Sequence, residues 1–238
     1  MHSDLDHILH SCTDILLHCA YHSEIILEAY SINMRLLELF AGTQSVGKVA
    51  RDLGIDVVSL DRDMAADIRC DIMDWDYRVY PNKHFDIIWA SPPCTEYSRA
   101  KTTGIRDIEG ANKVVQRTLD ILEYYEPRFW IIENPQTGLL KDQVCMWGLP
   151  FVDVDYCRYG MPYRKRTRLW NNVFSWVHRP LCARDCWAMN EARTRHKETA
   201  QRAGHTAEDR LTQRRFKQSE LYIVPDALIR EILSSIIQ

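Results

Sequence analysis

The stretch MRLLELFAGTQSVGKVARDLGIDVVSLD (residues 34–61) decides the fold class of this chain. It opens with an apolar run (34–40) and passes through a turn that contains a glycine (41–45). Apolar residues at helical spacing follow (46–54), and a second apolar run closed by an acid ends the stretch (56–61). This order predicts a strand, a helix and a second strand parallel to the first. Such a unit is typical of folds that bind nucleotides, in which the final acid can accept hydrogen bonds from ribose hydroxyls.

The same alternation continues along the chain. Four further apolar runs predict strands, and apolar residues at helical spacing predict a helix over residues 112–125. The runs are FDIIWA (85–90), FWIIEN (129–134), VDVDYC (152–157) and RLWNNV (168–173). Alternating strands and helices predict an α/β fold with a doubly wound, mostly parallel sheet that binds ligands at the carboxyl ends of its strands.

Length and composition predict one sizeable core with a small appendage. The chain has 238 residues, of which 46% are hydrophobic and 26% charged. We expect a helical extension at 1–33, a central domain at 34–173, a small basic region at 174–217 and a C-terminal helix at 218–238 that completes the central domain. Because no apolar run reaches about 18 residues and the first residues are acidic, we expect no membrane segment and a cytoplasmic or nuclear protein.

Charge is distributed unevenly along the chain. The formal net charge is −3, yet residues 157–217 hold 15 Lys and Arg against 5 Asp and Glu. A localised basic block in an acidic protein favours a polyanionic partner such as nucleic acid, although a solvated basic surface would have the same composition. Eight cysteines at irregular spacing, without a secretion signal, predict thiols, metal ligands or a nucleophile rather than a disulfide framework.

Three polar segments follow predicted strands: FAGTQS (40–45), SPPCTEYS (91–98) and ENP (133–135). Because parallel strands bring their carboxyl ends to one edge, these segments should meet there. Together with YGMPYRKRTRLW (159–170), RLTQRRF (210–216) and YIVPDALIREIL (222–233), they resemble the motifs of the C5-cytosine DNA methyltransferase family, and in particular its short phage or viral members. The resemblance spans residues 34–233 and implies the Rossmann-like fold of methyltransferases that depend on S-adenosylmethionine (SAM).

The resemblance assigns SAM to the first predicted turn and the strand ends beside it. The carboxylate of Asp61 would accept the ribose hydroxyls, Asp71 would bind the exocyclic amine of adenine, and Pro92 or Pro93 would line the site near the methyl donor. The full predicted set is Phe40, Ala41, Gly42, Asp61, Asp71, Ile72 and Pro93. The chain departs from the family in this turn, where Gln44 and Ser45 replace a pair of glycines.

The resemblance also implies the chemistry of Cys94. Its thiolate would add to C6 of a cytosine, while Glu133 stabilises the ring at N3. Because the ring is inaccessible in a stacked duplex, the base must be flipped out of double-stranded DNA. The arginine motif implies base and phosphate contacts for Arg164, Arg166 and Arg168, and Ser98 resembles a serine that contacts the target nucleotide. Arg193, Arg195 and Lys197 in the basic block are predicted phosphate contacts.

Two other functions are compatible with the same motifs. One is an RNA cytosine-5 methyltransferase, because a basic surface does not distinguish RNA from DNA and some members of the family modify tRNA. The other is a catalytically silent SAM-fold protein that binds nucleic acid, a function that retention of Cys94 and Glu133 disfavours. The oligomeric state stays open.

Residues 174–217 are too few to fold on a hydrophobic core alone, and they contain a possible metal site. Cys182 and Cys186 follow a C-x3-C spacing, His196 comes soon after, and Cys157 precedes the arginine motif. These four residues predict a structural zinc site with three cysteine ligands and one histidine, and His205 is the alternative to Cys157 as the fourth ligand. The competing interpretation is that the cysteines pack as small apolar residues.

Overall fold

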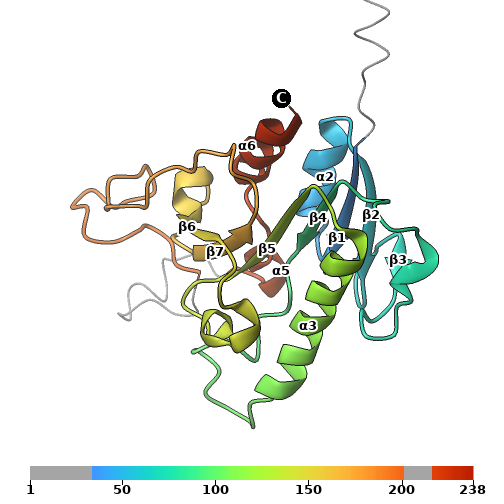
Figure 1. Cartoon of the computed structure of the whole chain (residues 1–238). Helices are drawn as coiled ribbons and strands as arrows, with labels where there is room; N and C mark the ends of the chain where they lie inside the picture. Colours follow the sequence, from blue (N-terminus) through green and yellow to red (C-terminus); the bar gives the residue numbers. More distant parts are fainter. Residues whose placement is uncertain (1–33, 201–215, 238) are drawn as a thin grey trace, which may run out of the picture. The chain divides into compact units, whose positions relative to one another are not determined.

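A single seven-stranded sheet forms the framework of the computed structural model, which describes residues 34–200 and 216–237 (Figure 1). The strands in spatial order are β3 (Ile68–Arg69), β2 (Asp56–Asp61), β1 (Arg35–Leu39), β4 (Ile87–Ala90), β5 (Phe129–Pro135), β7 (Arg166–Asn171) and β6 (Phe151–Asp155). Each predicted strand is present, and its ends lie within two residues of the expected ones. The two-residue strand β3 was not predicted, because two residues are too short for a periodic pattern.

Strand direction divides the sheet into two parts. The pairs β2–β3, β1–β2, β1–β4 and β4–β5 are parallel, whereas β7 runs antiparallel to both β5 and β6. The predicted α/β fold with a mostly parallel sheet is therefore confirmed. The antiparallel strand follows from the short connection after β6, which contains only the 3-10 helix η4 (Tyr156–Tyr159) and a turn at Gly160. A connection of this length turns the chain back and lacks the helix that a parallel crossover normally uses.

Helices cover both faces of the sheet. One face packs against α2 (Ser45–Asp52) and α6 (Asp226–Ile237), and the other packs against α3 (Ile108–Tyr125). Leu36 belongs to the first core, whereas its neighbours Leu37 and Leu39 belong to the second, as expected for side chains that alternate along a strand. The remaining short elements are the 3-10 helices η1 (Tyr77–Val79), η2 (Leu140–Asp142) and η3 (Val144–Met146), and the helix α5 (Gln218–Leu221).

The C-terminal helix α6 packs on the domain that the N-terminal half builds. Leu228, Ile229 and Ile232 share a core with Val46 and Val49 of α2.

In contrast, residues 174–200 contain no helix or extended strand, and their one β-bridge joins Met189 to His196. Within the described parts of the chain, no helix has the length and apolarity needed to cross a membrane. The expected extension at 1–33 lies outside the described residues, as does His205.

Candidate active site

A cavity of about 370 Å³ opens at the carboxyl ends of β1, β2, β4 and β5. Its volume suits a small organic ligand. The predicted cofactor residues Phe40, Ala41, Gly42, Asp61, Asp71, Ile72 and Pro93 all line it, as do the predicted catalytic residues Cys94 and Glu133. The structure thus places nine predicted residues from five separate segments around one cavity.

The turn after β1 depends on three residues in the left-handed region of the backbone. The φ angles are 60° at Phe40, 52° at Gly42 and 55° at Gln44. Residues other than glycine rarely adopt a positive φ, and they do so mainly where surrounding contacts enforce it. At Gln44 the side-chain amide donates to the carbonyl of Ala65 over 2.8 Å. The chain therefore reaches a glycine-like backbone geometry at a position where the related family has glycine.

Glu38 is a buried acid of this site that the sequence analysis did not select. Its carboxylate accepts hydrogen bonds from the amides of Val46 (3.2 Å) and Gly47 (3.0 Å) in the first turn of α2. A Cβ at Gly47 would lie 2.6 Å from Glu38 Oε2, so only glycine allows this approach. Burial raises the pKa of Glu38 to about 7. Its only sequence signal is an acid within the apolar run LELF.

Two carboxylates at the cavity are oriented by backbone amides. Asp61 Oδ1 accepts from the amides of Asp63 and Met64, each over 2.8 Å, and Oδ2 accepts from Gly42 over 2.8 Å. A carboxylate offers about four acceptor positions, so Asp61 keeps one for a ligand. Asp71 Oδ1 accepts from the amide of Met73 over 2.9 Å, and its other oxygen pairs with Arg62 over 3.4 Å.

The loop that carries Cys94 is attached to the neighbouring strand. Asn134 Nδ2 donates to the carbonyl of Pro92 over 2.8 Å, which holds the two prolines against β5. Asn134 Oδ1 is buried and has no hydrogen-bond partner among the described residues. Burial raises the pKa of the Cys94 thiol, while the positive charge of Lys165 lowers it and the negative charge of Glu133 raises it further. The three side chains are therefore electrostatically coupled.

Glu133 is buried beside a phenol and a cation. The hydroxyl of Tyr156 donates to Glu133 Oε1 over 2.9 Å, and Lys165 Nζ lies 3.6 Å from the same oxygen. Lys165 also stands over the ring of Tyr156, 4.9 Å from its centroid, and donates to the carbonyl of Leu221 over 3.1 Å. These contacts fix the orientation of Glu133 at the cavity wall. Sequence reasoning missed both Tyr156 and Lys165.

The predicted arginines lie elsewhere. Arg166 pairs with Asp155 and Arg168 with Asp153, in each case through two hydrogen bonds of 2.7–3.0 Å. These aspartates are the direct cross-strand neighbours of the two arginines. Neither arginine lines the cavity. Lys165, one residue before β7, lines it beside Glu133, and Arg62 lines it beside Asp71. The catalytic roles of Arg166 and Arg168 stay predictions.

The predicted nucleic-acid contacts lie outside the cavity. Arg164, Arg193, Arg195 and Lys197 are exposed. Ser98 is half-buried, and its hydroxyl accepts from the amide of Ala100 over 3.2 Å. The exposed side chains are accessible to phosphate groups, and the roles assigned to these five residues stay predictions.

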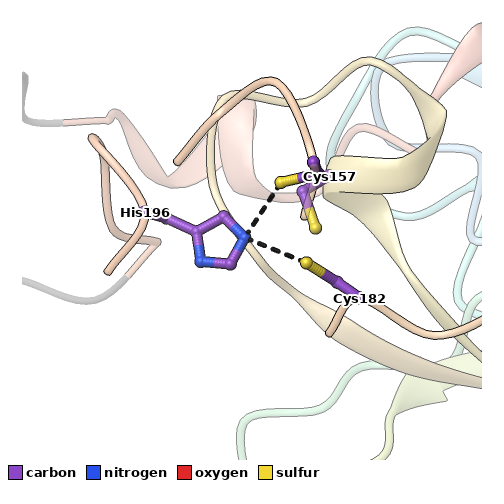
Figure 2. A group of neighbouring side chains, drawn as sticks. Cys157, Cys182 and His196 are labelled. Carbon is purple, nitrogen blue, oxygen red and sulfur yellow. Dashed lines mark hydrogen bonds between the residues drawn. The ribbon is translucent and has the colours of Figure 1, made fainter. Parts of the chain in front are cut away.

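The four predicted metal ligands come together. Cys157, Cys182, Cys186 and His196 each direct one potential ligand atom into a cluster in which all four atoms lie within 4.8 Å of one another. Figure 2 shows the ring of His196 turned towards the sulfur atoms. The cluster lies apart from the cavity, since none of its members contributes to the cavity lining.

Comparison with known proteins relates the chain to methyltransferases. The model of the family described as C-5 cytosine-specific DNA methylase matches residues 62–143. Over 220 residues the chain is 34% identical to a protein of Frog virus 3 (isolate Goorha) named "Probable DNA (cytosine-5)-methyltransferase". That alignment covers 84% of this chain and 99% of the viral protein.

Solved structures of methyltransferases match part of the chain. A DNMT2 mutant of Spodoptera frugiperda matches with a TM-score of 0.40 and 16% identity, covering 61% of this chain and 52% of the other. The methyltransferase EhMeth of Entamoeba histolytica matches with a TM-score of 0.42 and 13% identity, covering 63% of this chain and 56% of the other. The chain thus spans about half the length of each.

Proposed function

The chain belongs to the C-5 cytosine-specific DNA methylase family, and from that premise we propose that it methylates C5 of a cytosine in double-stranded DNA, with SAM as methyl donor and Cys94 as covalent catalyst. One observation carries the proposal. Cys94 and Glu133 line the same cavity as Asp61, Asp71 and the turn after β1. Nucleophile, acid and nucleotide-binding groups therefore share one space.

The residues of the cavity fit SAM. Asp61 keeps an acceptor position for a ribose hydroxyl, Asp71 offers a carboxylate to the adenine amine, and Ile72 supplies an apolar surface for the ring. When bound, SAM supplies a methyl group made electrophilic by its positive sulfur. A structural zinc ion at the cluster of Cys157, Cys182, Cys186 and His196 would be a second bound group.

Cys94 acts first as a nucleophile. Its thiolate forms a bond to C6 of cytosine, and the electron pair of the C5–C6 double bond becomes available at C5, which is otherwise too poor a nucleophile to accept a methyl group. After methylation, loss of the proton on C5 returns an electron pair to the ring and expels the Cys94 thiolate. A cysteine suits both steps, because sulfur is strongly nucleophilic and is also a good leaving group.

Glu133 stabilises the base while the thiolate adds. Negative charge moves towards N3 of the ring, where a positioned carboxyl group can donate a proton or hold one in a hydrogen bond. Tyr156 and Lys165 keep that carboxyl in one orientation. Lys165 also acts on the nucleophile, because its charge lowers the pKa of Cys94 against the effect of burial. We therefore assign Lys165 the role of positioning Glu133 and favouring the thiolate.

Methyl transfer from tritiated SAM to duplex DNA and to tRNA, in parallel, tests the proposal. Incorporation into duplex DNA and none into tRNA is expected, whereas incorporation into tRNA alone would establish the RNA alternative. Cys94→Ala should abolish methyl transfer while SAM binding persists. Cys145 is half-buried and does not line the cavity, so Cys145→Ala should retain both methyl transfer and SAM binding. Duplex DNA with 5-fluorocytosine, whose C5 substituent cannot leave as a proton, should form an adduct stable on denaturing gels. Full turnover by Cys94→Ala would refute the mechanism.

A further inference from the structure

A side-chain cluster outside the catalytic cavity has the composition and spacing of a metal centre. His196 Nε2 lies 3.5 Å from Cys182 Sγ and 3.3 Å from Cys186 Sγ, and Cys157 completes a group of four ligand atoms within 4.8 Å of one another. Figure 2 labels Cys157, Cys182 and His196 of this group. The three cysteines are buried and the histidine is half-buried. Cys157 lies in η4, Cys182 and Cys186 lie in the loop after β7, and His196 follows a turn further along that loop. A metal bound by all four would connect three separate segments.

The distances match tetrahedral zinc. With Zn–S bonds of about 2.3 Å and a Zn–N bond of about 2.0–2.1 Å, tetrahedral geometry separates neighbouring ligand atoms by roughly 3.5–3.8 Å. The sulfur–nitrogen distances are already close to that range, and the widest pair would need to approach by no more than about 1 Å. Three thiolates and one imidazole form a common structural zinc set. We infer that Cys157, Cys182, Cys186 and His196 bind a structural zinc ion.

Apolar packing alone gives this region little stability. Its buried core consists of the three cysteines together with Ala188 and Met189. Large apolar side chains nearby face solvent, with Phe174 85% exposed and Val177 87% exposed. A segment with so small a core needs another source of folding free energy, and zinc binding can provide it directly.

Two backbone hydrogen bonds place His196 beside the cysteines. The amide of Asn190 donates to the carbonyl of Arg195 over 3.0 Å, and that of Lys197 donates to Ala188 over 2.8 Å. These bonds close a tight turn over residues 190–195 that returns the chain beside Cys186. The loop geometry therefore presents the imidazole next to the C-x3-C pair.

The zinc site connects the loop of residues 182–196 to the strand pair β6–β7 and, through Tyr156, to Glu133 at the cavity. The amide of Cys182 donates to Asp155 Oδ2 over 2.9 Å, the oxygen that also accepts from Arg166. Cys157 directly follows Tyr156, whose hydroxyl holds Glu133. The metal thus anchors the loop that carries Arg193 and Arg195 to the strand pair β6–β7. On the basis of the proposed function, zinc positions these cations for DNA.

Metal analysis tests the site independently of methyl transfer. Protein purified under reducing conditions without chelator should contain about one zinc per chain, and Co²⁺ exchange should produce the intense visible bands of a tetrahedral thiolate site. Cys182→Ser should lose most of the metal, whereas Cys145→Ser, a matched change outside the cluster, should retain it. Because Cys182→Ser can fail to fold, His196→Cys provides a second variant, which should keep zinc in a four-thiolate site.

Two results would overturn the inference. One is wild-type protein that is folded and metal-free and that shows no tetrahedral Co²⁺ spectrum after reconstitution. The other is a disulfide between two cluster cysteines in protein that still binds SAM and DNA with full affinity. Either result would leave the proposed methyltransferase function intact, because metal content and spectra are measured without any turnover. Conversely, a protein that binds one zinc per chain but transfers no methyl group would contradict the proposed function and support the zinc site.

Discussion

Replacement of Lys165 by Met should slow methyl transfer by about two orders of magnitude. Lys165 Nζ lies 3.6 Å from Glu133 Oε1, and the two side chains are 17% and 7% exposed. At that distance an effective dielectric constant of about 20 gives a Coulomb attraction of roughly 4–5 kcal/mol. Desolvation of both charges offsets part of this energy, so we expect a net loss of about 2–3 kcal/mol in stabilisation at the catalytic step.

The same change should also affect the nucleophile. Without the positive charge of Lys165 the pKa of Cys94 rises further, so less thiolate is present at a given pH. Alkylation of Cys94 by iodoacetamide, followed against pH, should therefore show a higher midpoint and a slower rate near pH 8. This measurement needs no substrate, which separates an effect on the thiol from an effect on DNA binding.

Two further variants make this test specific. Lys165→Arg keeps the charge and should retain more activity than Lys165→Met. Lys113→Met removes an exposed lysine on α3 that pairs with Glu109 over 3.2 Å, and it should change neither turnover nor alkylation. Turnover of Lys165→Met within twofold of the wild type, together with an unchanged alkylation midpoint, would refute the assigned role of Lys165.

Two other predictions concern pH and salt. Burial raises the pKa of Glu38 from 4.5 to about 7, so the folded chain holds a proton that the unfolded chain releases. The resulting stability is complete below about pH 4.5 and is lost as pH rises through about 7, by up to roughly 3 kcal/mol. Urea unfolding at pH 5 and pH 8 should show this loss in the wild type and less of it in Glu38→Gln; equal losses would contradict it. Neutralising Arg193, Arg195 and Lys197 together should reduce the slope of log affinity for DNA against log salt by about 0.9 for each lost phosphate contact. An unchanged slope would mean that these side chains make no phosphate contacts.

Local patterns in the sequence determined the core elements and the motifs of the site. Apolar runs identified six of the strands. The pattern is strongest in the central strands β1, β4 and β5, because a parallel strand buried on both faces is apolar along most of its length. The order of the strands then placed Cys94 and Glu133 at one edge, since the carboxyl ends of parallel strands converge there. The four residues that we propose as zinc ligands were also identifiable, because the C-x3-C spacing with a histidine nearby is typical of metal sites.

Only the tertiary structure decided which side chains meet. The direction of β7 depends on a short connection, and a hydrophobic pattern carries no information about direction. That antiparallel register pairs Arg166 with Asp155 across the strands and leaves Lys165, one residue earlier, to face Glu133. A shift of one residue exchanges the two faces of a strand, so the arginine motif alone did not identify Lys165 as the cation beside Glu133. Glu38 became part of the site for a similar reason, because its partners Val46 and Gly47 approach it only when α2 packs on β1.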